Sequence, residues 1–262
     1  MKSVSYLRYV AVGDSQTEGL MDGDEASGYR GWADRLAGKL AADAGPDFRY
    51  ANLAVRGHLA AAIRAGQTEA ALALKPDLVT VLAGMNDLIR PGCDADAVAA
   101  DLDAMLAAFA ASGATVVTFT LPDVGAISPL AVRFRPRVMA FNDRVRAMAG
   151  RHGTVLVDTW GLPFLTDPRI WNADRLHASP VGHARIAAAV ADALDLPGSD
   201  GSWADPLPPL PVRITSAPAW RRAGAEVMWA GTFLGPWVWR RIRGRSSGDG
   251  RTAKRPELLP FS

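Results

Sequence analysis

Cysteine is almost absent from the sequence, and Cys93 is its single representative among 262 residues. One thiol excludes an internal disulfide and a metal site built from several thiolates, and it is typical of a reducing compartment. The N-terminal residues also lack the apolar stretch of about 7–15 residues and the small-residue cleavage site of a secretory signal, so we expect a cytoplasmic protein. No apolar run approaches about 18 residues without interruption, and no membrane-spanning helix is expected.

The motifs of common metal- and nucleotide-dependent enzymes are missing as well. The four histidines show no His-Glu-x-x-His arrangement. Residues 13–19 supply neither a phosphate-binding loop nor a Gly-x-Gly-x-x-Gly motif. Cys93 has no histidine nearby in the sequence and is interpreted as an incidental residue at the start of a helix. The sequence therefore predicts a protein without a metal ion or other cofactor.

The composition is otherwise that of an ordinary globular protein. Apolar residues make up 49% and charged residues 21%, values that exclude a disordered or fibrous chain. The formal net charge is only +2, but arginine and lysine gather towards the C-terminal end while the rest of the chain is close to balanced. A basic surface is therefore expected mainly on the C-terminal part.

Short apolar runs alternate along the chain with longer amphipathic segments. The runs are bounded by Gly, Asp, Pro or Asn and predict buried strands at residues 9–12, 50–54, 78–83, 115–121 and 155–160. The segments between them have apolar residues at three- and four-residue spacings and predict helices at 31–44, 59–74, 94–111, 136–151 and 180–194. This alternation predicts an α/β fold with a central five-stranded parallel sheet and helices on both faces.

Prolines mark a change of character after residue 196. They predict a linker and include Pro197, Pro206, Pro208, Pro209 and Pro211. We therefore expect one domain over residues 1–196 and an extension over residues 197–262. The extension is basic and rich in tryptophan, and we expect it to pack on the domain, with a polar and flexible end over residues 244–262.

Ser15 is the candidate nucleophile, because it lies where the first predicted strand breaks into a loop, and ligands of such sheets bind at the carboxyl ends of the strands. A hydroxyl group needs a base to remove its proton. His177 is the candidate base, since Asp174 can fold back onto its Nδ1 across one tight turn and stabilise the imidazolium. Each motif alone is also typical of an ordinary surface turn.

Two further residues are expected at the same edge of the sheet, where they could stabilise negative charge. Gly57 follows the second predicted strand and offers a backbone N–H on a chain that can approach closely. Asn86 follows the third strand and offers a side-chain amide. Together with the N–H of Ser15 they would form an oxyanion hole with three donors.

Three residues near these candidates receive a structural interpretation. Asp14 and Asp87 are expected to accept hydrogen bonds from backbone N–H groups. His183 lies at the start of the last predicted helix and is expected to pack or to cap it rather than to act as a second base.

In combination, four ordered blocks resemble those of the SGNH hydrolase superfamily, also called GDSL esterases and lipases. The blocks are Gly13-Asp14-Ser15, residues 52–57, Gly84-Met85-Asn86-Asp87 and Asp174-x-x-His177, and the resemblance spans residues 9 to about 195. Gln16 stands where the family name has leucine, and its side chain is not expected to touch the reacting atoms.

The resemblance implies a flavodoxin-like three-layer α/β/α sandwich and an esterase that needs no cofactor. It implies a catalytic triad of Ser15, His177 and Asp174, and an oxyanion hole from Ser15, Gly57 and Asn86. It further implies that the substrate is a small-molecule acyl ester, hydrolysed through an acyl-enzyme on Ser15. Residues 122–135, including Phe134, and residues 163–171 are the predicted pocket walls.

The C-terminal extension supports a second hypothesis, in which the protein binds a membrane surface or a partner and the hydrolase domain is secondary. Tryptophan beside arginine is typical of an interfacial helix, and a nucleic-acid patch can look similar. Gly235-Pro236 interrupts the apolar stripe of such a helix, which favours tryptophans that pack on the domain. We expect no nucleic-acid partner. The four tryptophans concerned are Trp220, Trp229, Trp237 and Trp239.

Overall fold

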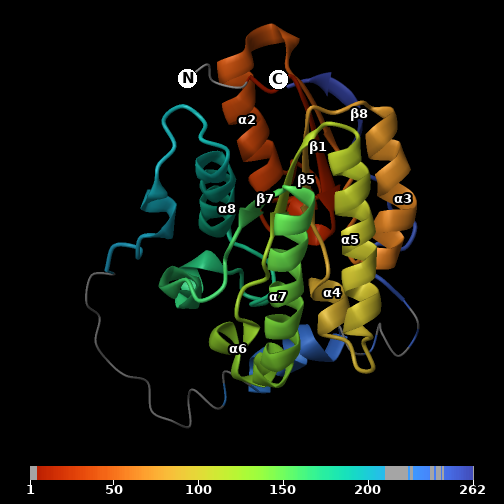
Figure 1. Ribbon diagram of the computed structural model, residues 1–262. Helices are drawn as coiled ribbons and strands as arrows, with labels where there is room; N and C mark the ends of the chain where they lie inside the picture. Colours follow the sequence, from red (N-terminus) through yellow and green to blue (C-terminus); the bar gives the residue numbers. More distant parts are fainter. Residues whose placement is uncertain are drawn as a thin grey trace.

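A sheet of six strands forms the centre of the molecule (Figure 1). The computed structural model describes residues 5–209, 224, 227–236, 239, 243 and 245–261. The strand order is β7-β6-β5-β1-β4-β8. The strands are β1 (Arg8–Gly13), β4 (Arg49–Asn52), β5 (Leu78–Leu82), β6 (Thr115–Phe119), β7 (Val155–Val157) and β8 (Arg255–Pro260). A separate hairpin pairs β2 (Gly23–Asp24) with β3 (Gly28–Tyr29).

The first five strands in the order are parallel, and each overlaps one of the predicted apolar runs. In the centre of the sheet, Val10 of β1 pairs in register with Ala51 of β4 and Val79 of β5. Both faces of β1 are buried, because Val10 points into one apolar cluster and Tyr9 into the other. Such two-sided burial is what a parallel sheet covered by helices requires. The prediction of a parallel α/β sheet is confirmed.

The sixth strand corrects the prediction of five strands and of a flexible C-terminal end. β8 comes from the extension and pairs antiparallel with β4, with Tyr50 opposite Leu259. Pro256 and Pro260 deprive β8 of two N–H donors, which a strand tolerates only at an edge. β8 covers the exposed edge of β4, and the Phe261 ring that follows packs edge-on against Tyr50 at 5.9 Å.

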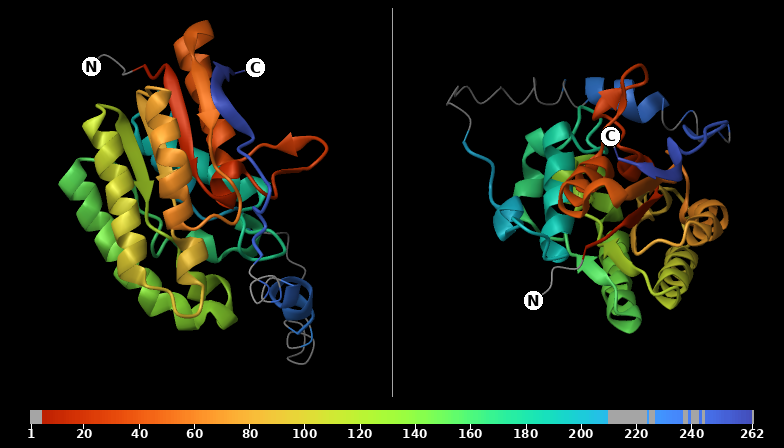
Figure 2. Two further views of the ribbon diagram at one scale, coloured as in Figure 1. Left: turned by 90° about the vertical axis from the view of Figure 1, so that its right-hand side faces the viewer. Right: turned by 90° about the horizontal axis from the view of Figure 1, so that it is seen from above.

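Five long helices cover the two faces of the sheet. Figure 2 shows α2 and α8 on one face and α3, α5 and α7 on the other, which confirms the three layers. Asp94 caps α5 by accepting from the N–H groups of Asp96 and Ala97, and Ser179 caps α8 in the same way through Gly182. The helices are α2 (Trp32–Ala44), α3 (Ala60–Ala73), α5 (Ala95–Ala111), α7 (Arg135–His152) and α8 (Pro180–Ala193).

Shorter helical turns occupy the connections between these elements. The α-helical ones with described bounds are α1 (Ser15–Glu18), α4 (Met85–Leu88) and α6 (Val124–Ile127). The 3-10 turns are Gly45–Asp47, Pro129–Phe134, Pro163–Thr166, Pro168–Ile170 and Gly201–Ala204, and Ala230–Leu234 forms a π-helical turn. Of the helices that the structure describes, none is long and apolar enough to cross a membrane. The boundary after residue 196 stays a prediction.

Candidate active site

The first strand ends in a turn that presents Ser15. Asp14 caps α1, since its Oδ1 accepts a hydrogen bond from the N–H of Gln16 at 3.2 Å. Gly13 is held on both sides by the Gln67 amide, which accepts from its N–H and donates to its carbonyl, both at 2.9 Å. Asn52 ties the other end of α1 by donating to the Thr17 carbonyl at 2.8 Å. The backbone around Ser15 is therefore fixed by buried side chains.

His177 lies between Ser15 and Asp174, as the sequence predicts. Its Nε2 is 2.8 Å from Ser15 Oγ, and its Nδ1 is 2.6 Å from Asp174 Oδ2. The other carboxylate oxygen of Asp174 accepts from the N–H groups of Leu176 and His177, both at 3.0 Å. Burial alone would raise the pKa of Asp174, but the hydrogen bonds from His177 and from these backbone groups outweigh it and lower the pKa below its usual value. The carboxylate is thus ionised and orients the imidazole.

Gln16 joins the nucleophile turn to the histidine loop, a role that the sequence did not suggest. Its Nε2 donates to the carbonyl of Leu176 at 2.8 Å, and its Oε1 accepts from the N–H of Ala178 at 3.2 Å. The amide therefore forms hydrogen bonds with the backbone of the residues before and after His177. Leucine at this position could make neither hydrogen bond. These two hydrogen bonds fix the distance between the loops that carry Ser15 and His177.

The predicted oxyanion residues Gly57 and Asn86 follow the two strands that flank β1. Gly57 follows β4 with a positive φ of 75°, and Asn86 lies in α4 after β5. The Asn86 amide donates to Asp14 Oδ2 at 3.0 Å and to the carbonyl of His58 at 3.1 Å. It therefore bridges the nucleophile turn and the glycine loop. A substrate oxyanion would compete with Asp14 for one of these two protons.

The structural interpretations of Asp14, Asp87 and His183 are confirmed. Asp14 accepts from the N–H of Gln16, and Asp87 Oδ2 accepts from the N–H of Ala60 at 3.1 Å. His183 is fully buried, and its Nδ1 accepts from the N–H of Trp32 at 3.2 Å. Burial lowers the pKa of His183 to about 4, so this imidazole is neutral near pH 7.

Replacing Asp87 by asparagine is expected to stabilise the protein at alkaline pH. Burial raises the pKa of Asp87 from its ordinary 3.8 to about 6, so the folded state binds a proton more tightly than the unfolded chain and stability falls as the pH rises through this range. Asparagine removes the charge and keeps an oxygen for Ala60. After discounting for solvent screening, we expect the free energy of unfolding of Asp87→Asn to exceed that of wild type by about 1–2 kcal/mol at pH 8. This corresponds to a Tm about 2–8 °C higher.

Thermal melts of Asp87→Asn and wild type between pH 4 and pH 8 measure this effect. The Tm difference should shrink steadily towards pH 4, because the folded state holds the proton there and the unfolded carboxyl, whose ordinary pKa is 3.8, begins to bind it as well. The exposed Asp47→Asn is the matched control and should show no such trend. A Tm difference for Asp87→Asn that does not depend on pH would contradict the assignment.

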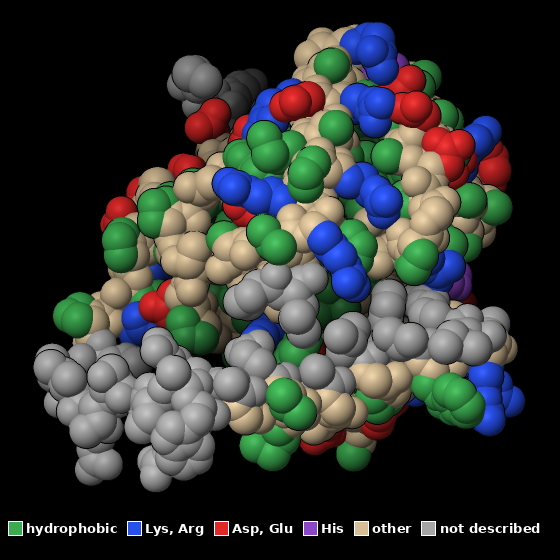
Figure 3. Space-filling model, turned by 90° about the horizontal axis from the view of Figure 1, so that it is seen from below, with side chains coloured by type: hydrophobic (Ala, Val, Ile, Leu, Met, Phe, Trp, Pro, Cys, Tyr) green, Lys and Arg blue, Asp and Glu red, His purple; other side chains and the backbone are tan. Residues whose placement is uncertain are grey.

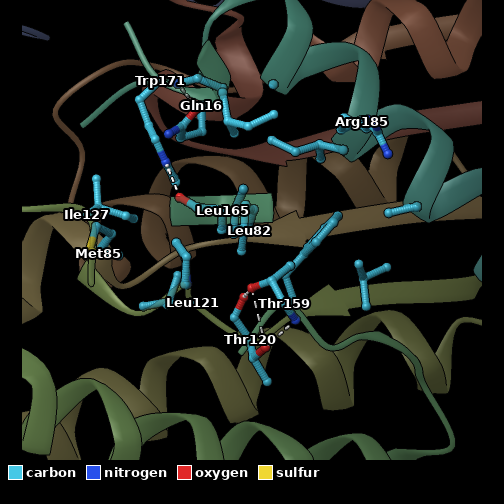
Figure 4. A pocket seen from close by; sticks show the side chains of 18 of the residues that line it. Gln16, Leu82, Met85, Thr120, Leu121, Ile127, Thr159, Leu165, Trp171 and Arg185 are labelled. Atoms are coloured by element: carbon cyan, nitrogen blue, oxygen red, sulfur yellow. Dashed lines mark hydrogen bonds between the residues drawn. The ribbon is translucent and has the colours of Figure 1, made fainter. Parts of the chain in front are cut away.

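An apolar cavity of about 100 Å³ adjoins the nucleophile turn (Figure 4). Its lining includes Asp14 and Gln16 of the nucleophile turn, Arg185 of α8 and Trp203. Its polar groups are mostly paired, since Thr120 and Thr159 bond each other and Trp171 Nε1 donates to the Leu165 carbonyl at 2.7 Å. The apolar lining residues include Leu82, Met85, Phe119, Leu121, Val124, Ile127, Val157, Phe164, Ile170 and Ile186.

Both predicted pocket walls contribute to this cavity. Pro122, Val124 and Ile127 come from the first wall, and Phe164, Leu165, Ile170 and Trp171 come from the second. Phe134 is not among the lining residues and instead packs against the hydrophobic core. Among the residues that the structure describes, no group of three or more His, Cys, Asp or Glu side chains is placed to hold a metal ion.

Comparison with known protein families shows to which family the chain belongs. The model of the GDSL-like lipase/acylhydrolase family matches residues 11–185, which include Ser15, Gly57, Asn86, Asp174 and His177. The chain belongs to this family. A GDSL-like acylhydrolase acts on ester bonds, and the prediction of an esterase-type hydrolase is confirmed at this level. No curated protein matches the chain in sequence.

Several solved structures are similar to this GDSL-like acylhydrolase. LAE5, an alpha/beta hydrolase from the metagenome of Lake Arreo, Spain, is 25% identical with a TM-score of 0.59, covering 71% of this chain and 94% of its own. TesA is 29% identical with a TM-score of 0.55, and the match covers 71% of this chain and 97% of TesA. Axe2, an acetylxylan esterase from Geobacillus stearothermophilus, shares the fold at 20% identity with a TM-score of 0.63. The match covers 77% of this chain and 100% of Axe2.

Proposed function

We propose that the protein is a serine esterase that works through an acyl-enzyme on Ser15. One observation carries this proposal: Ser15, His177 and Asp174 form an unbroken chain of hydrogen bonds, 2.8 Å and 2.6 Å long, at the carboxyl ends of the strands. The chain connects a hydroxyl, a base and an ionised carboxylate in the order that nucleophilic catalysis needs. The roles of the individual residues follow from this geometry.

In the first step Ser15 Oγ attacks the ester carbonyl carbon while His177 Nε2 takes its proton. Asp174 stabilises the imidazolium that forms. The N–H groups of Ser15 and Gly57 and the amide of Asn86 stabilise the tetrahedral oxyanion. The intermediate expels the alcohol, which receives the proton from His177. Water then attacks the acyl-enzyme by the same route, releasing the carboxylic acid and restoring Ser15.

Structures of Axe2 offer independent support for this choice of residues. Three of them are described as catalytic mutants and carry alanine in place of a serine, an aspartate and a histidine. The aspartate and the histidine of Axe2 are three positions apart, as Asp174 and His177 are in this chain. The same residue types at the same spacing support an acid–base pair at these positions.

We further propose that the apolar cavity holds the acyl chain of a small ester. It begins beside the nucleophile turn and presents hydrophobic side chains to its contents. A cavity of about 100 Å³ has room for a short run of methylene groups beyond an acetyl unit. The preferred acyl group is therefore short to medium in length.

Hydrolysis of p-nitrophenyl esters from acetate to palmitate tests this preference. We expect kcat/KM to rise about fourfold per methylene, from about 0.8 kcal/mol of burial each, to a maximum beyond acetate and well short of palmitate. Ser15→Ala serves as the blank, and EDTA should leave the rates unchanged. Ile127→Trp, which narrows the cavity, should shift the maximum towards acetate. If kcat/KM does not change along the ester series, or if its maximum does not shift in Ile127→Trp, the acyl chain binds to another surface.

The C-terminal extension packs against the histidine loop at one described point. Trp229 Nε1 donates to the carbonyl of Ala173 at 2.9 Å, and the Arg175 guanidinium lies 4.9 Å from its ring centre. This contact supports packing of Trp229 on the domain, whereas Trp239 is 55% exposed. Trp220 and Trp237 lie outside the described residues. The membrane-surface or partner-binding alternative stays a prediction, as does the cytoplasmic location.

A further inference from the structure

The C-terminal segment 245–261 returns to the active-site end of the sheet before it forms β8 (Figure 2). Residues 246–248 of this segment, which we call the serine turn, contact the glycine loop that follows β4. Ser246 Oγ donates to the carbonyl of Gly57 at 3.1 Å. Gly248 is buried although its neighbours on either side are exposed. The segment lies beyond the part of the chain that matches the family model, residues 11–185.

The contact between the two loops is so close that both sides require glycine. A Cβ atom on Gly57 would lie 2.3 Å from Ser246 Oγ and 2.7 Å from Ser247 Oγ. A Cβ atom on Gly248 would lie 2.1 Å from the carbonyl oxygen of Arg56. A larger residue at position 248 would collide with the backbone of the glycine loop, and one at position 57 would displace the two serine hydroxyls.

These contacts fall on the two peptide units that flank Gly57. The peptide between Arg56 and Gly57 carries the N–H that is the proposed oxyanion donor. Because a peptide unit is planar and trans, this N–H points opposite to the Arg56 carbonyl. Gly248 packs on that carbonyl, and Ser246 binds the carbonyl of the next peptide. The serine turn therefore limits rotation of the donor about the chain axis.

The serine turn is itself held rigid by its own hydrogen bonds and by ion pairs. Asp249 Oδ2 accepts from the N–H of Ser246 at 2.9 Å, and Ser246 Oγ accepts from the N–H of Gly248 at 3.2 Å. Arg251 pairs with Glu25 at 2.9 Å. Glu25 also pairs with Arg56, which pairs in turn with the buried Glu18 of α1. The ion pairs thus connect the turn to the glycine loop and to the helix that begins at Ser15.

Further anchors hold the segment against the core on the way to β8. Lys254 Nζ donates to Asp34 Oδ2 at 2.6 Å and to the carbonyl of Tyr29 at 2.8 Å. Arg255 Nε donates to the carbonyl of Tyr50 at 2.9 Å.

Figure 3 shows the face below the carboxyl ends of the strands, where lysine and arginine side chains lie among apolar ones.

We infer that the serine turn is a positioning element of the oxyanion hole, in which Ser246 and Gly248 hold the Gly57 N–H towards the carbonyl oxygen of the substrate. This inference rests on the proposed serine esterase function. Neither residue lines the apolar cavity, and we assign neither a contact with the substrate. Their effect is expected only where negative charge develops, which is in the transition state rather than in the bound ester.

Kinetics of Ser246→Ala in the full chain test the inference. Loss of one oxyanion donor costs about 10²–10³-fold in kcat, and a donor that is present but less well aimed should cost about 10-fold. We therefore expect kcat for p-nitrophenyl butyrate to fall about 10-fold with KM within about twofold of wild type. Ser246→Thr keeps the hydroxyl and should recover most of the rate. Thr252→Ala, an exposed position in the same segment, is the matched control.

A double-mutant cycle with Asn86→Ala adds a readout that a purely structural role would not move. Residues that serve one oxyanion hole act together, so the two substitutions should be non-additive in kcat. Asp249→Asn perturbs the turn from its exposed side and should give a smaller loss of the same kind. A changed Tm with unchanged kcat, or a loss seen only in KM, would overturn the inference. Full activity of Ser15→Ala would instead overturn the proposed function itself.

Discussion

Replacing Ser15 by alanine is expected to lower kcat for ester substrates by about 10⁴-fold or more, because the variant has no oxygen to attack the carbonyl and cannot form the acyl-enzyme. Ser15 is 7% exposed, and its hydroxyl group is hydrogen-bonded to His177. Alanine fits the same turn, since α1 is capped by Asp14 and not by Ser15. The fold should therefore be retained.

Steady-state rates with p-nitrophenyl butyrate, together with a thermal melt, measure this effect. Ser202→Ala changes an exposed serine and should keep wild-type rates. Any remaining activity in Ser15→Ala should be insensitive to a further His177→Ala change, because triad members act as a unit. A folded Ser15→Ala variant that turns over esters at a tenth of the wild-type rate would refute the nucleophile assignment.

Asp174→Asn should have the second-largest effect, a fall of about 10³–10⁴-fold in kcat. The asparagine oxygen can still accept from the N–H groups of Leu176 and His177, so the turn is expected to form. Its amide nitrogen, however, would donate to His177 Nδ1, and the tautomer that results carries its proton on Nε2. That imidazole cannot take the proton of Ser15.

The double variant Ser15→Ala/Asp174→Asn is the control for this assignment. It should be no slower than Ser15→Ala alone, since the aspartate acts only through the histidine and the serine. The melting temperature of Asp174→Asn should stay within a few degrees of wild type. Retention of more than about a tenth of kcat by a correctly folded Asp174→Asn would remove the aspartate from the triad.

The parallel sheet could be predicted because its strands carry their own signals. Each is an apolar run that ends at a residue suited to a turn, and the helices between them repeat every three to four residues. β8 has no such signal. It is a short edge strand with Pro256, Pro260 and mostly exposed side chains, so its position depends on the free edge of β4.

The same distinction applies to the site. Asp174 and His177 lie three residues apart, and a single turn brings them together, so the sequence could predict the pair. Gln16 contacts Leu176 and Ala178 across 160 or more residues of chain, and Ser246 contacts Gly57 across 189. Such contacts depend on the packing of whole elements. Local patterns do not encode them, which is why neither Gln16 nor the serine turn was expected.

Labelling with a fluorophosphonate, followed by mass spectrometry of the peptides, tests the central claim most directly. The reagent forms a stable covalent bond with a serine only where a base and an oxyanion site activate it. We predict one label per chain, on Ser15, with the reaction lost in His177→Ala and slowed in Ser246→Ala. A chain that stays unlabelled, or one that carries the label at another residue, would contradict the assignment of Ser15 as the activated nucleophile.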